Sequence, residues 1–160
     1  PRALEAISIA DLIILGPGSL YTSLLPNLLV QELVGAIQRS RAPKLYICNL
    51  MTQPGETDGL DVVGHLRAIE AQLASLGINQ KLFSAVLAQN ELGQSQLVKH
   101  YKSRGAEPVH CDKRSLTAKG YEVMQAPLQG SRPQATLRHD PRSLALAVMR
   151  FYRKHKRNSQ

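Results

Sequence analysis

"DLIILGPGSLYTS", residues 11–23, joins a short apolar run to a loop that contains two glycines and a proline. A continuous apolar run that ends in glycine is typical of a strand buried on both faces of a parallel sheet. The loop then carries four hydroxyl side chains before the next apolar segment. The stretch therefore predicts a strand, a tight loop and a helix, which is how a βαβ unit begins.

The rest of the chain repeats this alternation of strand and helix. Short apolar runs predict further strands over residues 44–50, 81–89, 107–112 and 121–129. Apolar residues at helical spacing predict helices over residues 26–40, 60–77, 95–105 and 140–157. We therefore expect an α/β, Rossmann-like fold with a mostly parallel sheet covered by helices on both faces. Residues 1–160 are predicted to form a single domain, in which residues 150–160 are a basic helix end or tail.

The composition is that of an ordinary globular domain. Hydrophobic residues make up 43% of the 160 residues. No apolar run approaches the ~20 residues needed to cross a bilayer, so no transmembrane segment is predicted. Two cysteines and five histidines are too scattered to form a structural zinc site. Cys48 is predicted to be a small core residue, and the low cysteine count suits a reducing cytoplasm.

Much of the net charge of +8 lies near the C-terminus, in Arg150, Arg153, Lys154, Lys156 and Arg157. A basic helix end complements the helix dipole and keeps a terminus solvated, and we favour this interpretation. The alternative is an arm that binds nucleic acid or an anionic membrane. Because the chain has two Phe and no Trp, stacking platforms are scarce, and no DNA partner is expected.

The loop "GPGSLYTS", residues 16–23, is a candidate phosphate cradle. Gly16 and Gly18 keep side chains out of the path of a ligand, and the backbone N–H groups of such a loop bind anions without a lysine. Ser19, Thr22 and Ser23 add hydroxyl donors. The Walker A ending, the third glycine of G-x-G-x-x-G and the G-x-S-x-G arrangement are all missing. Ser19 is therefore not predicted to be a nucleophile, and the alternative to a cradle is a plain turn.

A dense run of polar residues, "NLMTQPGETDG" at 49–59, follows the predicted second strand. Ligands of parallel sheets bind at the carboxyl ends of the strands. The polar side chains of this run suit recognition of a base, a sugar or a metal-bound diphosphate, and they are Asn49, Thr52, Gln53, Glu56, Thr57 and Asp58. A structural role is the alternative, in which Thr57 or Asp58 caps the next helix. No metal site is predicted, and the alternative is that Glu56 and Asp58 hold Mg²⁺.

The segment "LRHDP", residues 137–141, precedes the last predicted helix. Arg138 supplies a planar fork suited to phosphate. A histidine near a helix start is more often structural than catalytic, so His139 is given no chemical role. Asp140 is the expected N-cap, followed by proline in the first turn. Arg138 is therefore the candidate binding residue of this segment.

The motifs "ADLIILGPGSLYTSLLPNLLV", "YICNLMTQPGETDG" and "LRHDP" occur in this order, and with them the chain resembles the gluconeogenesis-factor (YvcK-type) family of the CofD-like superfamily. The resemblance spans nearly the whole chain and covers the C-terminal half of that family. It implies a Rossmann-like protein of the bacterial cytoplasm that binds UDP-sugars such as UDP-N-acetylglucosamine. Family members are linked to cell shape, peptidoglycan synthesis and growth on gluconeogenic carbon sources, without a settled catalytic activity or a firm cofactor.

The resemblance also implies roles for the candidate residues. The phosphate side of the pocket would be lined by Gly16, Gly18, Ser19 and Thr22. Beside it would lie Asn49, Thr52, Gln53 and Glu56. Arg138 would contact the nucleotide sugar. Some family members carry a phosphorylatable threonine after "RHD", where this chain has Pro141, so that form of regulation is not expected here.

The related CofD branch is enzymatic and implies the alternative function. Its members are 2-phospho-L-lactate transferases, which use Mg²⁺ in making a deazaflavin coenzyme. The loop of that branch resembles GP-x-N-P-x-T-S, whereas this chain has "GPGSLYTS". This departure favours the YvcK-type branch, so we expect a regulator rather than an enzyme.

The N-terminal half of the family, with a first strand of GGGTG type, has no counterpart in these residues. The chain also begins without Met, in a segment that resembles the middle of a helix. We therefore expect it to be part of a longer protein. Alone, such a half exposes a sheet edge and part of a core, which favours a homo-oligomer or low stability.

Overall fold

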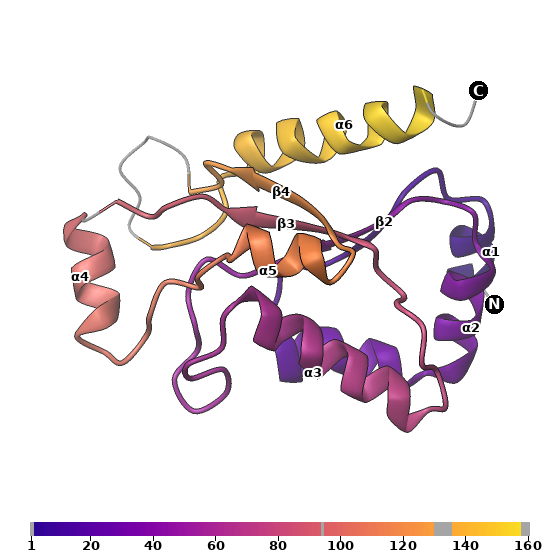
Figure 1. The fold of residues 1–160 in the computed structure, drawn as a ribbon, viewed down its shortest axis with the longest axis horizontal. Coiled ribbons are helices and arrows are strands. Elements are labelled where there is room, and N and C mark those ends of the chain that lie inside the picture. The colour runs from indigo at the N-terminus through magenta and orange to yellow at the C-terminus, as the bar shows by residue number, and fades with distance from the viewer. Residues whose placement is uncertain (1, 94, 130–135, 158–160) are drawn as a thin grey trace.

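The computed structural model describes residues 2–93, 95–129 and 136–157 (Figure 1). Its centre is a sheet of four parallel strands in the order β1-β2-β3-β4. The strands are β1 (Ile13–Leu15), β2 (Lys44–Ile47), β3 (Ala85–Gln89) and β4 (Glu122–Ala126). The predicted Rossmann-like α/β fold is confirmed.

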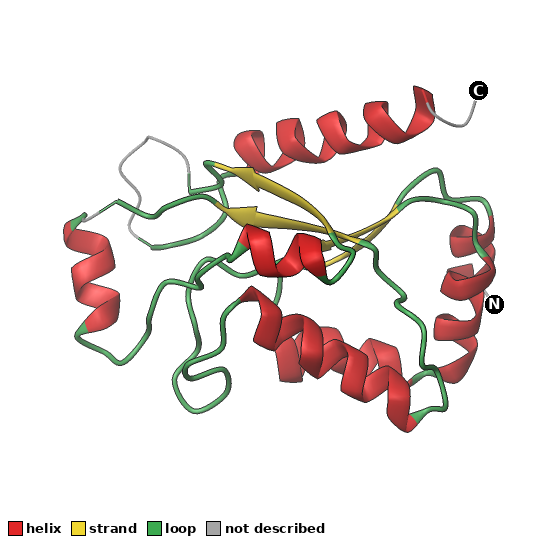
Figure 2. Cartoon of the chain, in the orientation of Figure 1, coloured by secondary structure: helices red, strands yellow, loops and turns green. Residues whose placement is uncertain are grey.

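Helices cover both faces of this sheet. The α-helices are α1 (Arg2–Ser8), α2 (Gln31–Arg39), α3 (Val62–Ser75), α4 (Gln96–Lys102), α5 (Lys113–Ala118) and α6 (Pro141–Arg157). Because the strands follow one another in sequence order, right-handed crossovers place α2, α3 and α5 on one face, whereas α4 and α6 contribute to the core of the other face. Figure 2 shows α3 and α5 below the sheet and α6 above it. The expected basic helix end extends to Arg157, and residues 158–160 lie outside the described residues.

Alternating side chains of the strands enter two hydrophobic cores, one on each face. Tyr46 and Val86 point into the core formed with α2, α3 and α5. Leu45 and Leu87 point into the second core, formed with α4 and α6. Cys48 is a buried free thiol, as the sequence predicts, and burial raises its pKa to about 12. This sulfur is therefore a packing group and not a thiolate.

The helix predicted over residues 26–40 is interrupted. A π-helical turn, η1 (Leu20–Leu24), is followed by a 3₁₀ segment, η2 (Leu25–Leu29), and then by α2. Val30 is extended, with φ −82° and ψ 99°, and separates η2 from α2. The Asn27 side chain donates to the Ser23 carbonyl oxygen at 2.7 Å, so it competes with the backbone for that acceptor. This competition and Pro26, which has no N–H to donate, favour the irregular turns of η1 and η2, and the break itself lies at Val30.

The strand predicted over residues 107–112 is wrong. Only an isolated antiparallel bridge, between Met51 and Pro108, forms there. Pro108 has no N–H to donate, and both backbone groups of Glu107 bond to Thr52 instead. The helix α5 follows and was not predicted. Its N-cap is Asp112, whose carboxylate accepts from the Ser115 N–H at 3.0 Å.

Side-chain caps fix the ends of the long helices. Asp61 caps α3 by accepting from the Gly64 N–H at 2.7 Å, so the alternative caps Thr57 and Asp58 are wrong. Gly77 follows the end of α3 with φ +79°, as expected of a C-terminal glycine. Asp140 accepts from the Ser143 N–H at 2.8 Å, which confirms it as the cap of α6.

His65, on α3, is fully buried. Its Nδ1 lies 2.9 Å from the Asp61 carbonyl oxygen and therefore carries the proton that it donates. The other ring nitrogen, Nε2, has no partner within the described part of the chain. Burial lowers the pKa of His65, so the ring is neutral in the folded protein at neutral pH.

Acid is expected to destabilise the fold through this ring. Because the pKa of His65 is lower in the folded chain than in the unfolded chain, unfolding takes up a proton once the pH falls below about 6.5. The free energy of unfolding then falls by up to about 1.4 kcal/mol per pH unit from this group. Urea unfolding measures this effect. Between neutral and mildly acidic pH, the free energy of unfolding should fall less in His65→Leu than in the wild type. An equal loss in both proteins would contradict this assignment.

None of the described helices is by itself long and apolar enough to span a membrane. One pair, Leu20–Leu29 with Gln31–Arg39, passes that test jointly by length and composition, but it is bent by 79°.

Candidate functional site

A pocket of about 740 Å³ lies at the carboxyl ends of β1 and β2. Three segments enclose most of it: the loop after β1, the loop after β2, and the segment that leads into α6. Its lining consists of Pro17, Gly18, Ser19, Asn49, Leu50, Met51, Thr52, Gln53, Tyr101, Leu137, Arg138, His139, Pro141 and Leu144. The structure therefore brings together all three motifs that the sequence singles out, although they are far apart in the chain.

Six of the nine candidate residues line this pocket. They are Gly18, Ser19, Asn49, Thr52, Gln53 and Arg138. The other three, Gly16, Thr22 and Glu56, lie outside the lining. Gly16 supports the loop from behind, and Thr22 and Glu56 both bond to the Ser19 side chain. The pocket thus has a lining set and a supporting set.

Gly16 allows the end of β1 to approach β2 closely. Its φ is +94°, in the region that favours glycine. A Cβ at this position would lie 2.6 Å from the carbonyl oxygen of Ile47. Gly16 is therefore required by packing, and the bond that follows it, to Pro17, is cis. Gly16 therefore shapes the loop from outside the pocket lining.

A chain of hydroxyl and carboxylate groups ties the first loop to the second. The Thr22 hydroxyl donates to the Ser19 Oγ at 2.7 Å, and the Ser19 hydroxyl donates to the Glu56 carboxylate at 2.6 Å. The Ser19 side chain therefore does not cap η1. Because the Ser19 proton goes to Glu56 and the Thr22 proton goes to Ser19, neither hydroxyl is left as the donor that the sequence predicts, and Ser19 offers only its remaining lone pair.

Asn49 and Thr52 hold the second loop in place. The Asn49 side-chain amide donates to the Gly18 carbonyl oxygen at 2.9 Å. Thr52 is buried, and its N–H and hydroxyl bond to the O and N–H of Glu107, at 2.7 and 2.8 Å. Thr52 is therefore chiefly structural. Asn49 keeps its side-chain oxygen as an acceptor for a ligand.

Arg138 and His139 differ in their surroundings although they are neighbours. The His139 Nε2 lies 3.1 Å from the carbonyl oxygen of Cys48, just beyond β2. Burial lowers the pKa of His139, so a neutral ring donates this bond and fixes the segment to the sheet. Arg138 is exposed at the pocket. Within the described ranges its guanidinium has no hydrogen bond or ion pair, so all its donors are available.

Several lining residues carry no signal in the sequence. Tyr101 comes from α4, and its hydroxyl accepts from the Leu137 N–H at 3.3 Å. Together with Leu144, these side chains form an apolar wall. The helical pattern of residues 95–105 places Tyr101 on an apolar face, but nothing in it indicates a pocket.

The carboxylates proposed as the alternative Mg²⁺ pair are engaged separately. Asp58 accepts from the Gly55 N–H at 2.6 Å within its own turn, whereas Glu56 accepts from Ser19. Across the described residues no group of three or more His, Cys, Asp or Glu side chains is placed to hold a metal ion. The two side chains are therefore not a preformed ligand pair.

The fold and the pocket define a Rossmann-like α/β domain with a candidate binding site at the carboxyl edge of its sheet. The chain belongs to the CofD family: the family model described as 2-phospho-L-lactate transferase CofD matches residues 1–129. The resemblance to the gluconeogenesis-factor branch is also confirmed, because the similar curated proteins carry that name.

A putative gluconeogenesis factor from a Nostoc species is 41% identical over 152 residues, which are 95% of this chain and 32% of that protein. The gluconeogenesis factor of Bacillus subtilis is 37% identical over 145 residues, 91% of this chain and 44% of that protein. The crystal structure of a UPF0052 family protein from Bacillus halodurans superposes with a TM-score of 0.82 at 39% identity. The superposed residues are 92% of this chain and 46% of the Bacillus halodurans chain. The chain thus spans a third to a half of the length of these relatives.

Proposed function

We propose that the pocket at the ends of β1 and β2 binds the diphosphate of a nucleotide sugar, of the UDP-N-acetylglucosamine type. In this proposal the chain is the ligand-binding part of a cytoplasmic gluconeogenesis factor, a regulator of cell shape and of growth on gluconeogenic carbon sources. The names of its relatives support the broader role. The pocket is the basis for the ligand.

The observation that carries the proposal is the set of unused donors at the pocket. The Arg138 guanidinium is exposed there without a partner in the described ranges. Guanidinium groups bind phosphate oxygens through two parallel N–H bonds. The loop of Gly18 and Ser19 adds backbone N–H groups. The apolar wall of Tyr101, Leu137 and Leu144 offers a surface to the less polar part of a ligand.

A second candidate function is group transfer of the CofD type, and the Glu56 carboxylate is the observation that favours it. A carboxylate bonded to Ser19 places negative charge beside a proposed diphosphate site. In a transferase of this family Mg²⁺ would neutralise such charge, and catalysis would consist of positioning and electrostatic stabilisation. Incubation with an activated phospholactate and a deazaflavin acceptor, followed by mass spectrometry, tests for product.

Glu56→Gln separates the two functions. The amide oxygen keeps an acceptor for Ser19 but removes the negative charge. If the site binds a nucleotide sugar without a metal, Kd for UDP-N-acetylglucosamine should fall roughly twofold to fivefold in the presence of a chelator, since a repulsive charge near the surface is worth about 1 kcal/mol or less.

The matched control is Asp58→Asn, which removes a nearby charge that is bonded within its own turn. This variant should leave Kd unchanged. Tighter binding only when Mg²⁺ is present, lost in Glu56→Gln, would instead support the transferase.

A further inference from the structure

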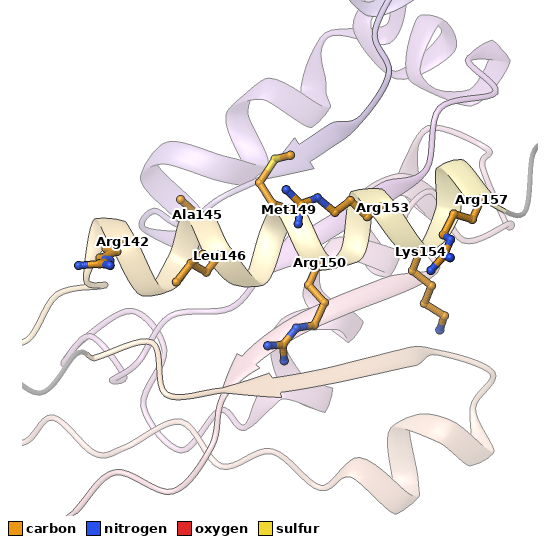
Figure 3. Close-up of a pocket in the computed structure, with 8 residues that line it drawn as sticks. All are labelled: Arg142, Ala145, Leu146, Met149, Arg150, Arg153, Lys154 and Arg157. Carbon is orange, nitrogen blue, oxygen red and sulfur yellow. The ribbon is translucent and has the colours of Figure 1, made fainter.

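The helix α6 has two faces, and only one of them is used by the fold. Ala147 and Phe151 are buried against the sheet, with Leu144 and Val148 packed beside them. On the outward face a groove is lined by Arg142, Ala145, Leu146, Met149, Arg150, Arg153, Lys154 and Arg157 (Figure 3). None of these residues lines the pocket at the strand ends. We call this surface the α6 outer face.

The centre of the α6 outer face is apolar and exposed. Leu146 is 63% exposed and Met149 is 42% exposed. Three residues apart on a helix, their side chains are neighbours, and Ala145 leaves room beside them. Anchors at this spacing are what a second helix packs against when it docks along a helical ridge.

The border of the α6 outer face is strongly basic. Arg142, Arg150, Arg153 and Arg157 make no hydrogen bond or ion pair within the described part of the chain, and no acidic residue lines the groove. Lys154 differs, because it bonds to Glu122 at 2.8 Å. His155 bonds to the same carboxylate at 3.1 Å, and both contacts hold α6 over β4. The arginines are thus free to bind a partner.

Charge and shape together decide what kind of partner fits. A second copy docked about a twofold axis would bring these arginines against each other. An anionic membrane would be a poor fit, because interfacial helices insert bulky and aromatic side chains, whereas this face offers two large apolar residues and no aromatic one. Nucleic acid would leave Leu146 and Met149 facing phosphate. An acidic protein surface with an apolar centre fits both parts of the α6 outer face, because its apolar centre can pack on Leu146 and Met149 and its carboxylates can pair with the arginines.

We propose that the α6 outer face docks an acidic amphipathic helix of another protein, with Leu146 and Met149 as the apolar anchors and Arg142, Arg150, Arg153 and Arg157 pairing with its carboxylates. Arginine and methionine, which both occur on the α6 outer face, are enriched in protein interfaces. The docking surface is separate from the proposed nucleotide-sugar site, so either can fail without the other.

The test uses a fluorescent synthetic helix with a leucine stripe flanked by glutamates, titrated into the 160-residue chain and followed by anisotropy. Two double variants are compared with the wild type, Arg150→Glu with Arg153→Glu, and Leu146→Ser with Met149→Ser. Each should raise Kd roughly tenfold or more. Since all four side chains are exposed, circular dichroism should show unchanged folding.

The control variant is Lys113→Glu with Arg114→Glu, which makes the same charge change on the exposed surface of α5 and should leave Kd unaltered. A lysine version of the peptide should bind the arginine-reversed variant. Equal binding of a glutamate-serine peptide of the same charge would overturn the proposal, because the anchors would then be irrelevant. Tighter binding of phosphatidylserine vesicles, lost in the same variants, would overturn it in favour of a membrane.

Discussion

Gly16→Ala is expected to lower the free energy of unfolding by about 3 kcal/mol or more, which is a large part of the margin of a domain this size. Two causes add. The positive φ of +94° strains any residue with a Cβ. The new Cβ would also lie 2.6 Å from the Ile47 carbonyl oxygen, so the ends of β1 and β2 must separate. Urea unfolding followed by circular dichroism measures the loss.

Gly77→Ala is the matched control for this substitution. Gly77 also has a positive φ, of +79°, but nothing lies within 4 Å of the Cβ position. The free energy of unfolding of Gly77→Ala should therefore fall only by the backbone strain of the positive φ, about 1 kcal/mol. If both alanine variants lost the same amount, the close approach of β1 to β2 would have no energetic weight.

Arg138→Ala is expected to weaken binding of UDP-N-acetylglucosamine at least tenfold, roughly 1.4 kcal/mol, while the free energy of unfolding stays unchanged. The side chain is exposed and has no hydrogen bond or ion pair in the described ranges, so the fold does not depend on it. A charge-assisted, two-pronged bond to phosphate is worth more than a neutral one. Calorimetric titration of wild type and variant gives both dissociation constants.

Arg142→Ala serves as the control, four residues further on and outside the pocket lining. It removes the same charge from a nearby exposed position that lies on the α6 outer face and not in the pocket. A tenfold loss in this variant as well would mean that binding senses net charge only. An unchanged dissociation constant in Arg138→Ala would remove Arg138 from the site.

Much of the fold follows from local patterns in the sequence. Short apolar runs predict β2 and β3 because a strand buried on both faces leaves few polar positions. The edge strands β1 and β4 are partly exposed, and β4 is found from its apolar residues although it carries Glu122 and Gln125. Asp140 and Gly77 mark helix ends through chemistry that involves only a few neighbouring residues. The prediction fails at Val30, where the apolar spacing continues but the backbone is extended and the helix is interrupted. A second error, at residues 107–112, comes from bonds between the Glu107 backbone and Thr52, 55 residues away.

The candidate site is only partly visible in the sequence. The loops that follow β1 and β2 are expected to meet, since adjacent parallel strands share a carboxyl edge. The bond from Ser19 to Glu56 joins residues 37 positions apart, and no local pattern indicates it. Tyr101 enters the pocket from α4, and no local pattern indicates this either. The predicted homo-oligomer also depends on surfaces beyond local patterns, and it stays a prediction.

The most direct test of the central claim is calorimetric titration of UDP-N-acetylglucosamine into the 160-residue chain, with UMP titrated in parallel. If the pocket recognises a nucleotide sugar, UDP-N-acetylglucosamine should bind at one site per chain, and UMP should bind at least roughly tenfold more weakly, because it lacks both the second phosphate and the sugar. Absence of saturable heat with UDP-N-acetylglucosamine, or equal binding of UMP, would contradict the claim that this pocket is a nucleotide-sugar site.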